Sequence, residues 1–348
     1  MSFQSKLDSF VESFSRVFDR NASTQQQLSV AGAVAVALAG TYFTLPSFDR
    51  KTLPSVKKAP TPSKGKEGEP YPLDIFPGGN WLDTPVGRIR YYEFGPPSSS
   101  AKGHIVLVHG ITTPQPWRAL APALTEAGYR VLSFDLPGRG LSDSPRVPHD
   151  THLFMSVMTY LLAGLPAWPT RFHLLGMSLG GGIVANFAHY FPQRVDKLIL
   201  MCPAGATPKN SLRPTARFFG SAYLAYPLME AMARTLPLGL PLSSANPLVA
   251  WQARKHPGFF YSFLSSYRSG PIFDQTDVFK QVIKAGGGKV SAIWGDGDTV
   301  VPMRSLEHLG EEGEMLRKNL SVVPGGDHFI VVTRPKETAE AVLKHLAS

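Results

Sequence analysis

The sequence contains very little cysteine. Its 348 residues include one, Cys202, which excludes an internal disulfide and a metal site built from several cysteines. Cys202 ends an apolar run that starts at Leu198, so we expect a buried structural thiol. The chain also lacks an H-E-x-x-H pattern and a phosphate-binding glycine loop, and the sequence therefore implies neither a metal nor a nucleotide cofactor.

Charged residues are sparse as well. They make up 18% of the chain against 43% hydrophobic residues, which is typical of a globular protein with a sizeable core. The length suits one large domain with attachments better than two equal domains. The formal net charge is +9, but the basic residues are spread out and no aromatic platform accompanies them. A membrane surface is therefore a better partner for this charge than a nucleic acid.

Residues 28–45 form a long run without any charged residue. A run of this length is at the short end of what crosses a bilayer, and Tyr42 and Phe43 would suit the membrane interface. We expect a single transmembrane helix. A buried helix of the globular domain, a cleaved signal peptide and a targeting presequence are the alternatives. The last two are disfavoured because a long polar segment with acidic residues precedes the run.

The segments that flank this run have their own character. Residues 1–27 place apolar side chains at helical spacing, which predicts an amphipathic helix. Residues 46–72 are rich in proline and lysine and are expected to form an extended, unstructured linker. Their excess of positive charge would keep the C-terminal domain on the cytosolic side of the membrane. The sequence indicates neither the organelle nor the oligomeric state.

Strands and helices alternate over residues 73–348. A β-hairpin is expected at 80–84 and 88–94. The predicted strands after it are 104–109, 130–134, 171–175 and 197–202, and the predicted helices between them are 117–127, 149–163 and 181–190. Strand 290–294, strand 320–323 and helix 336–345 complete the pattern. This alternation predicts an α/β fold with a doubly wound, mostly parallel sheet. The interruption at about 203–286 predicts an inserted helical cap, with helical stretches at 218–236 and 249–267.

One short motif separates a predicted strand from a predicted helix. It is the stretch Gly176-Met-Ser178-Leu-Gly180, which has the G-x-S-x-G form of a nucleophile elbow. Glycines suit both sides because the turn is tight and the serine must project its hydroxyl clear of the backbone. The N–H groups that open the next helix would face any negative charge formed there.

A serine needs a base, and the base needs a third group to hold its tautomer. Two later loops supply such residues after strands. The first contains Asp296 and Asp298, and the second contains Asp327 and His328. The order serine, acid, histidine is typical of α/β-hydrolases.

Five segments in this order make the chain resemble the α/β-hydrolase superfamily, in its serine esterase and lipase branch. They are His109-Gly110, Asp135-x-x-Gly138-x-Gly140-x-Ser142, the elbow, Gly295-x-x-Asp298-x-x-x-Pro302 and the loop around His328. The resemblance implies that Ser178 is the nucleophile, His328 the general base and Asp298 the orienting acid. Asp296 competes with Asp298 for that role. Asp327 departs from the glycine often found before the histidine, and its charge could shift the pKa of that histidine.

The resemblance also implies the remaining parts of the site. The backbone N–H groups of Ile111 and Leu179 would form the oxyanion hole. His109 is expected to shape its loop rather than to carry protons. Asp135, Gly138 and Gly140 are interpreted as turn architecture.

These observations predict a membrane-anchored serine hydrolase without a cofactor. Its substrate would be a carboxylic ester, a lipid or another hydrophobic ester, reached through the membrane segment 28–45 and the apolar cap. The same triad also serves acyltransferases, amidases and carbon–carbon bond hydrolases. A non-catalytic ligand-binding or scaffold protein on this fold is the alternative from another functional class.

Overall fold

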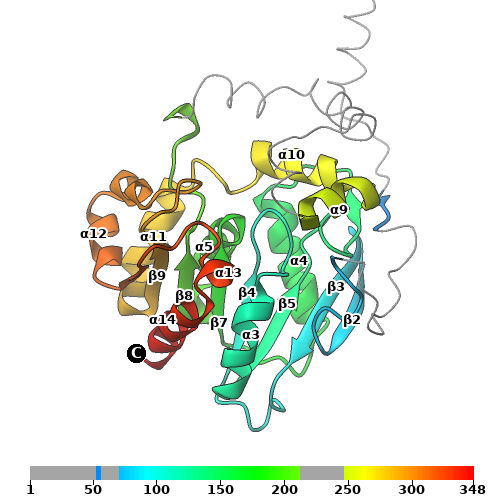
Figure 1. Ribbon diagram of the computed structural model, residues 1–348, viewed down its shortest axis with the longest axis horizontal. Coiled ribbons are helices and arrows are strands. Elements are labelled where there is room, and N and C mark those ends of the chain that lie inside the picture. Colours follow the sequence, from blue (N-terminus) through cyan, green and yellow to red (C-terminus); the bar gives the residue numbers. More distant parts are fainter. Residues whose placement is uncertain (1–51, 56–69, 212–246) are drawn as a thin grey trace, which may run out of the picture. The chain divides into compact units, whose positions relative to one another are not determined.

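The computed structural model describes residues 52–55, 70–211 and 247–348 (Figure 1). The predictions for residues 1–27, residues 28–45 and the helical stretch 218–236 lie outside these ranges. None of the helices within them is both long enough and apolar enough to cross a membrane.

The described residues form an eight-stranded sheet with the strand order β10-β9-β8-β7-β4-β5-β3-β2. Its strands are β2 (Gly79–Thr84), β3 (Gly87–Phe94), β4 (Gly103–Val108), β5 (Tyr129–Phe134), β7 (Phe172–Met177), β8 (Val195–Met201), β9 (Val290–Gly295) and β10 (Leu320–Val323). Strands β2 and β3 are the predicted antiparallel hairpin, and β3 runs antiparallel to β5. All other pairs are parallel, which confirms the doubly wound, mostly parallel sheet.

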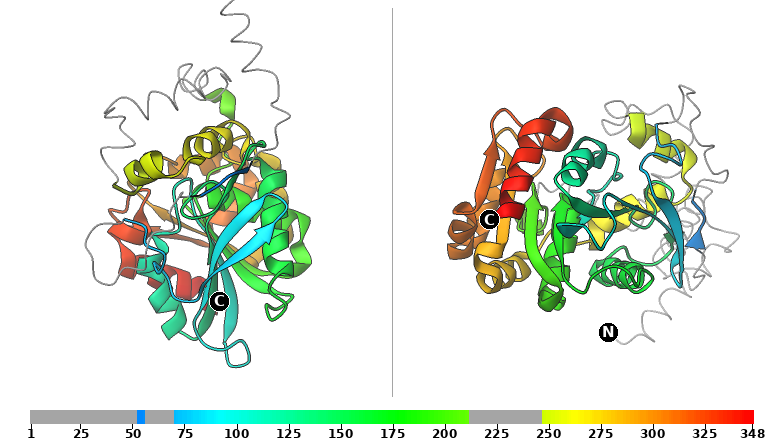
Figure 2. Two further views of the ribbon diagram at one scale, coloured as in Figure 1. Left: turned by 90° about the vertical axis from the view of Figure 1, so that its right-hand side faces the viewer. Right: turned by 90° about the horizontal axis from the view of Figure 1, so that it is seen from below.

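The central strands are continuous apolar runs because helices cover both faces of the sheet. In β4 the residues from Ile105 to Val108 are at most 1% exposed. Helices α3 (Trp117–Glu126) and α14 (Pro335–Ala347) pack together on one face. Helices α4 (Thr151–Ala163), α5 (Leu179–Tyr190) and α11 (Thr276–Gly286) cover the other face, as the view from below shows (Figure 2).

The direction of the strand order reverses at β4, which lies between β5 and β7. In α/β sheets, ligands bind beyond the carboxyl ends of the strands at such a switch point. The register pairs Val108 at the end of β4 with Gly176 in β7. The loop that begins at His109 and the elbow around Ser178 are therefore neighbours.

Two helices of the expected cap are described, α9 (Pro247–Lys255) and α10 (Phe259–Ser269). They lie over the carboxyl edge of the sheet (Figure 1). The sequence predicts one helical stretch over 249–267, whereas the structure has two, because Pro257 disfavours helical geometry in the residue before it. Helix α11 lies within the range assigned to the cap, but it packs against α5 and β9. Its buried residues Phe279, Val282 and Ile283 make it part of the helical layer on the sheet.

Two short parts of the predicted linker, residues 52–55 and 70–72, lie within the described structure. Residues Thr52–Leu53 form β1, which pairs antiparallel with β6 (Ser144–Pro145). The N–H of Ser55 donates a 2.8 Å hydrogen bond to Asp143. Tyr71 is fully buried, so the domain begins before residue 73. Proline and lysine content predicts an extended chain here, but it does not predict what such a chain packs against.

Candidate active site

Ser178 lies at a sharp turn between β7 and α5, with φ of 55° and ψ of −121°. A positive φ is uncommon for a residue with a side chain and marks a strained backbone. A Cβ atom at Gly176 would overlap the carbonyl oxygen of Gly180, and one at Gly180 would overlap that of Val108. The two glycines of the motif are therefore required by the close approach of the backbone.

The surrounding chain holds this turn in place. The N–H of Ser178 donates to the carbonyl of Met201, and the Ser178 carbonyl accepts from Gly181 and Ala204, all at 2.8–3.0 Å. Met177 and Leu179 are at most 3% exposed, whereas Ser178 is partly exposed. The strained turn thus presents the serine side chain away from the core, as the motif predicts.

An acid–imidazole pair follows the next two strands. His328, after β10, bonds through Nδ1 to Oδ2 of Asp298, after β9, at 2.8 Å. The other oxygen, Oδ1, accepts from the N–H groups of Val300 and Val301 at 2.9 and 2.8 Å. Asp298 and His328 are each 5% exposed. When the Nδ1 proton of a neutral imidazole is directed to the carboxylate, the lone pair lies on Nε2. Nε2 is then the nitrogen that can accept a proton from a nucleophile.

The two other candidate acids occupy different positions. Asp296 is exposed, and the bond to His328 comes from Asp298. The carboxylate of Asp327 accepts from the N–H of Phe329 at 2.9 Å and from the hydroxyl of Thr333 at 2.8 Å. Asp327 therefore orders the turn into the short helix α13 (Ile330–Thr333).

Cys202 is buried, as expected, and also lies beside the acid–imidazole pair. Its Sγ and ligand atoms of Asp298 and His328 are all within 4.8 Å of one another. Binding a metal there would require the thiolate and would compete with the hydrogen bond between Asp298 and His328. Burial raises the pKa of the Cys202 thiol, and Nδ1 is already bonded to Asp298. These residues therefore fit a metal poorly in their present state.

The loop after β4 carries the expected oxyanion donor Ile111. His109 in this loop is buried, and burial with the nearby Arg139 cation lowers its pKa to about 3. The neutral ring bonds through Nδ1 to the Gly110 carbonyl at 2.7 Å and accepts at Nε2 from the N–H of Leu136 at 2.9 Å. His109 thus shapes the loop. A Cβ at Gly110 would lie 3.2 Å from Cβ of Ser178, so the loop passes directly beside the serine.

The turn after β5 behaves as the predicted turn architecture. The Asp135 carboxylate accepts from the Tyr71 hydroxyl at 2.6 Å and from the Leu141 N–H at 2.7 Å. Burial raises the pKa of Asp135 to about 7, against the lowering effect of these two hydrogen bonds. Arg139 is fully buried in the same turn, and the sequence motifs do not predict a role for it. Its position between Gly138 and Gly140 is the only local feature of the sequence that draws attention to it.

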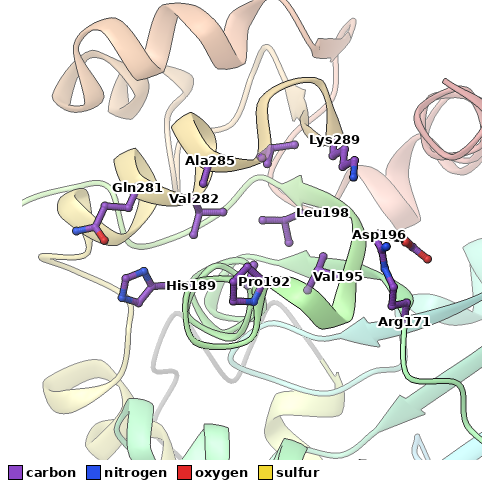
Figure 3. Close-up of a pocket in the computed structure, with 13 residues that line it drawn as sticks. Arg171, His189, Pro192, Val195, Asp196, Leu198, Gln281, Val282, Ala285 and Lys289 are labelled. Atoms are coloured by element: carbon purple, nitrogen blue, oxygen red, sulfur yellow. Dashed lines mark ion pairs between the residues drawn. The ribbon is translucent and has the colours of Figure 1, made fainter.

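A cavity of about 400 Å³ lies elsewhere in the domain (Figure 3). Leu198, Val282 and Val290 line it, and the Arg171–Asp196 ion pair, 2.8 Å long, lies at its rim. It lies beside the amino ends of β8 and β9, at the opposite edge of the sheet from Ser178. Asp298 and His328 do not line it either. The strand topology and the acid–imidazole pair therefore locate the candidate active site, and this cavity is not part of it.

Comparisons with known proteins agree with this fold. A family model described as "alpha/beta hydrolase fold" matches residues 103–335. The monoacylglycerol lipase ABHD6 of Homo sapiens is 26% identical over 298 residues, which are 77% of this chain and 85% of that protein. The crystal structure of a carboxylesterase from Nitrososphaera gargenis superposes with a TM-score of 0.57 at 22% identity. That match covers 77% of this chain and 98% of the other, and it is a likeness of fold.

A shorter match is higher in identity. An uncharacterised protein of Mycobacterium tuberculosis is 38% identical over 141 residues. The matched part is 39% of this chain and only 38% of the length of that protein.

Proposed function

Because the chain belongs to the alpha/beta hydrolase fold family, we propose that it is a serine hydrolase that cleaves carboxylic esters through an acyl-enzyme. The observation that carries the proposal is the buried hydrogen bond between Asp298 and His328. It accompanies a serine on a strained elbow at the switch point of the same sheet. The presence of the acid, the imidazole and the strained serine together counts against a non-catalytic protein on this fold.

In the acylation step, Oγ of Ser178 attacks the ester carbonyl carbon while Nε2 of His328 takes the hydroxyl proton. Asp298 orients the imidazole and stabilises its positive charge. The carbonyl oxygen becomes an oxyanion, which accepts hydrogen bonds from the N–H groups of Ile111 and Leu179. When the tetrahedral intermediate collapses, the carbon–oxygen bond to the alcohol breaks, and His328 returns its proton to the departing alkoxide.

Deacylation repeats this sequence with water. His328 takes a proton from a water molecule, whose oxygen attacks the acyl carbon of the acyl-enzyme. The bond to Oγ of Ser178 then breaks, Ser178 regains its proton from His328, and the carboxylic acid leaves. An alcohol in place of water would make the same site an acyltransferase, and turnover products distinguish the two reactions.

The proposed substrate is a hydrophobic ester such as a lipid. The uncharged segment 28–45 would bring the site to a membrane as a single-pass anchor, with the domain on the cytosolic side. The cap over the sheet edge would shelter an apolar chain. The similarity to a protein named as a monoacylglycerol lipase supports this substrate class.

Activity-based labelling tests the proposal directly. Full-length protein in detergent is treated with a fluorophosphonate probe and separately with p-nitrophenyl esters of increasing acyl length. We expect one labelled serine, turnover of the esters, and loss of both in Ser178→Ala. Absence of labelling in correctly folded wild-type protein would overturn the proposal. Labelling that persists in Ser178→Ala would place the nucleophile elsewhere.

A further inference from the structure

Arg139 is a buried cation at the base of the cap. It is fully buried in the turn after β5, where burial lowers its pKa to about 9. Burying a charge is costly unless hydrogen bonds replace the lost water. Among the described residues, the hydrogen-bond partners of Arg139 are carbonyl oxygens, a hydroxyl and an imidazole nitrogen rather than a carboxylate. The positions of these partners show which segments the guanidinium connects.

The guanidinium connects two parts of the proposed site. On one side, Nε donates to the carbonyl of Ile111 at 3.2 Å. On the other side, Nη2 donates to the carbonyl of Ser262 at 3.1 Å and to the hydroxyl of Ser266 at 2.9 Å. Ile111 belongs to the oxyanion loop, and both serines belong to cap helix α10. One planar guanidinium group therefore connects the cap to the loop.

Neighbouring contacts constrain the same loop. The bond between His109 Nδ1 and the Gly110 carbonyl fixes the peptide plane that also contains the N–H of Ile111. In a trans peptide, this N–H points away from the carbonyl oxygen. Arg139 holds the carbonyl of the next peptide, so Ile111 is restrained on both sides. This is the restraint that a preorganised oxyanion donor requires.

A second cap helix reaches the same region. Gln252 on α9 accepts from the N–H of Gly140 at 2.8 Å and donates to the carbonyl of Thr112 at 3.5 Å. The hydroxyl of Ser262 lies within hydrogen-bond distance of two carbonyl oxygens, that of Gly138 in the turn at 3.0 Å and that of Phe259 in its own helix at 2.9 Å. The described part of the cap therefore rests on the turn and the loop through buried polar contacts. Such contacts hold one geometry more strictly than apolar packing does.

We propose that Arg139 is a positioning residue of the oxyanion hole. Because cap helix α10 holds Arg139, the position of α10 is then part of the catalytic geometry. This inference rests on the proposed serine hydrolase function. Arg139 does not touch the substrate. It aims the Ile111 N–H by holding the following carbonyl, and it is itself held by Ser262 and Ser266. Displacement of α10 would release this restraint and weaken stabilisation of the oxyanion.

The first test replaces the guanidinium. Arg139→Met keeps an unbranched side chain but leaves the Ile111 carbonyl without its donor. Because misplacing a catalytic group by about 1 Å can cost about 100-fold, we expect kcat for a short, soluble ester to fall about 10-fold to 100-fold. We expect KM to change less than about 2-fold, since a lost transition-state contact lowers kcat without weakening ground-state binding. Arg139→Lys should recover part of kcat because it restores a buried donor.

A matched pair of serine variants keeps the test valid if Arg139→Met does not fold. Ser265 and Ser266 are adjacent, buried residues of α10, and both hydroxyls accept hydrogen bonds from the region beneath the cap. Ser266 accepts from Arg139, whereas Ser265 accepts from the N–H of His149 at 2.9 Å. We expect Ser266→Ala to lower kcat about 3-fold or more, and Ser265→Ala to leave it within about 2-fold.

Three readouts separate positioning from general stability. Thermal unfolding gives the folded fraction by which kcat is corrected. A trifluoromethyl ketone, whose bound form carries an oxyanion, should lose affinity for Ser266→Ala and Arg139→Met in parallel with kcat. A non-hydrolysable ether analogue of the ester should bind all variants equally.

Two outcomes would overturn the inference. One is a kcat equal to that of the wild type in Ser266→Ala or in a folded Arg139→Met variant. The other is a loss of kcat that is equal in Ser265→Ala and Ser266→Ala. Failure of the proposed function itself is distinguishable, because wild-type protein would then neither take up the fluorophosphonate nor hydrolyse any ester.

Discussion

His328 bonds to Asp298 across 2.8 Å, and two backbone N–H groups hold the remaining oxygen of the same carboxylate. The acid is thus fixed on both oxygens before any substrate arrives. Such a carboxylate can control the tautomer of the imidazole without moving. The arrangement makes Asp298 a precise target for substitution.

Asp298→Asn should abolish most of the esterase activity while preserving the shape of the site. An amide in this position favours the wrong imidazole tautomer, and we expect kcat to fall about 1,000-fold to 10,000-fold. The measurement is kcat with a p-nitrophenyl ester, alongside thermal unfolding. Asp296→Asn is the control and should retain kcat within about 2-fold, because Asp296 is exposed. Equal losses in both variants would show that the acid is not assigned correctly.

Acid should destabilise the fold below about pH 6.5. Burial lowers the pKa of His109 and His149 to about 3 and that of His256 to about 4. Their stabilising contribution is present above pH 6.5 and is lost as pH falls towards those values. Asp135 opposes them, because its raised pKa of about 7 makes the folded state hold a proton that the unfolded state releases above pH 3.8.

Near pH 5, these four groups together bind about two more protons in the unfolded state than in the folded state. We therefore expect their contribution to the free energy of unfolding to fall by about 3 kcal/mol per pH unit there. Urea unfolding between about pH 5 and about pH 7 measures the slope. His256→Gln, which preserves a donor towards the Ser142 carbonyl, should reduce this slope by about one proton. An unchanged slope in this variant would show that His256 titrates normally in the folded state.

Residues close in sequence could be predicted well. The apolar runs predict the strands. Ser178, Asp298 and His328 could be identified as candidate catalytic residues because each lies in a short motif within one loop. The predicted hairpin and the parallel order of the later strands were confirmed. Strand ends differ by one or two residues, since hydrogen bonding rather than composition ends them.

Long-range contacts could not be predicted in the same way. Arg139 meets partners that lie 28, 123 and 127 positions away in the sequence, and no local pattern specifies such distances. The same applies to Cys202, which lies beside Asp298 only because β8 and β9 are neighbours. Helix α11 was assigned to the cap because the pattern between Cys202 and Val290 does not show where the chain returns to the sheet.

Cys202 should be unreactive in the folded protein. It is buried, and burial raises its thiol pKa, so the reactive thiolate is scarce and inaccessible. We expect negligible reaction with 5,5′-dithiobis(2-nitrobenzoate) in buffer and one reacted thiol per chain in guanidinium chloride. Ser178→Ala, which leaves the thiol in place, should behave identically. Full reaction of the native protein would show that the region beneath Asp298 opens to solvent.

Filling the cavity of Figure 3 should not affect hydrolysis. Ala285 lines this cavity from α11 and is exposed, so Ala285→Trp can occupy the space without disturbing the core. Because the cavity lies at the opposite edge of the sheet from Ser178, we expect kcat and KM within about 2-fold of wild type. Lys289→Glu, which reverses a charge at the same cavity, provides the second test. A large change in KM in both variants would mean that this cavity takes part in substrate binding.

The membrane segment makes a prediction that is independent of catalysis. If residues 28–45 span a bilayer, the full-length protein expressed in cells should stay in the membrane pellet after alkaline carbonate extraction, which removes proteins held only by charge. A chain that starts at Thr52 should appear in the supernatant and remain active, since it keeps the pairing of β1 with β6 and the Tyr71–Asp135 hydrogen bond. A full-length chain with three leucine-to-lysine or valine-to-lysine substitutions within 28–45 is the matched control. It should be released by carbonate, because lysines at the bilayer centre are expensive. Release of the wild-type chain into the supernatant would remove the anchor from the proposal and leave the hydrolase intact.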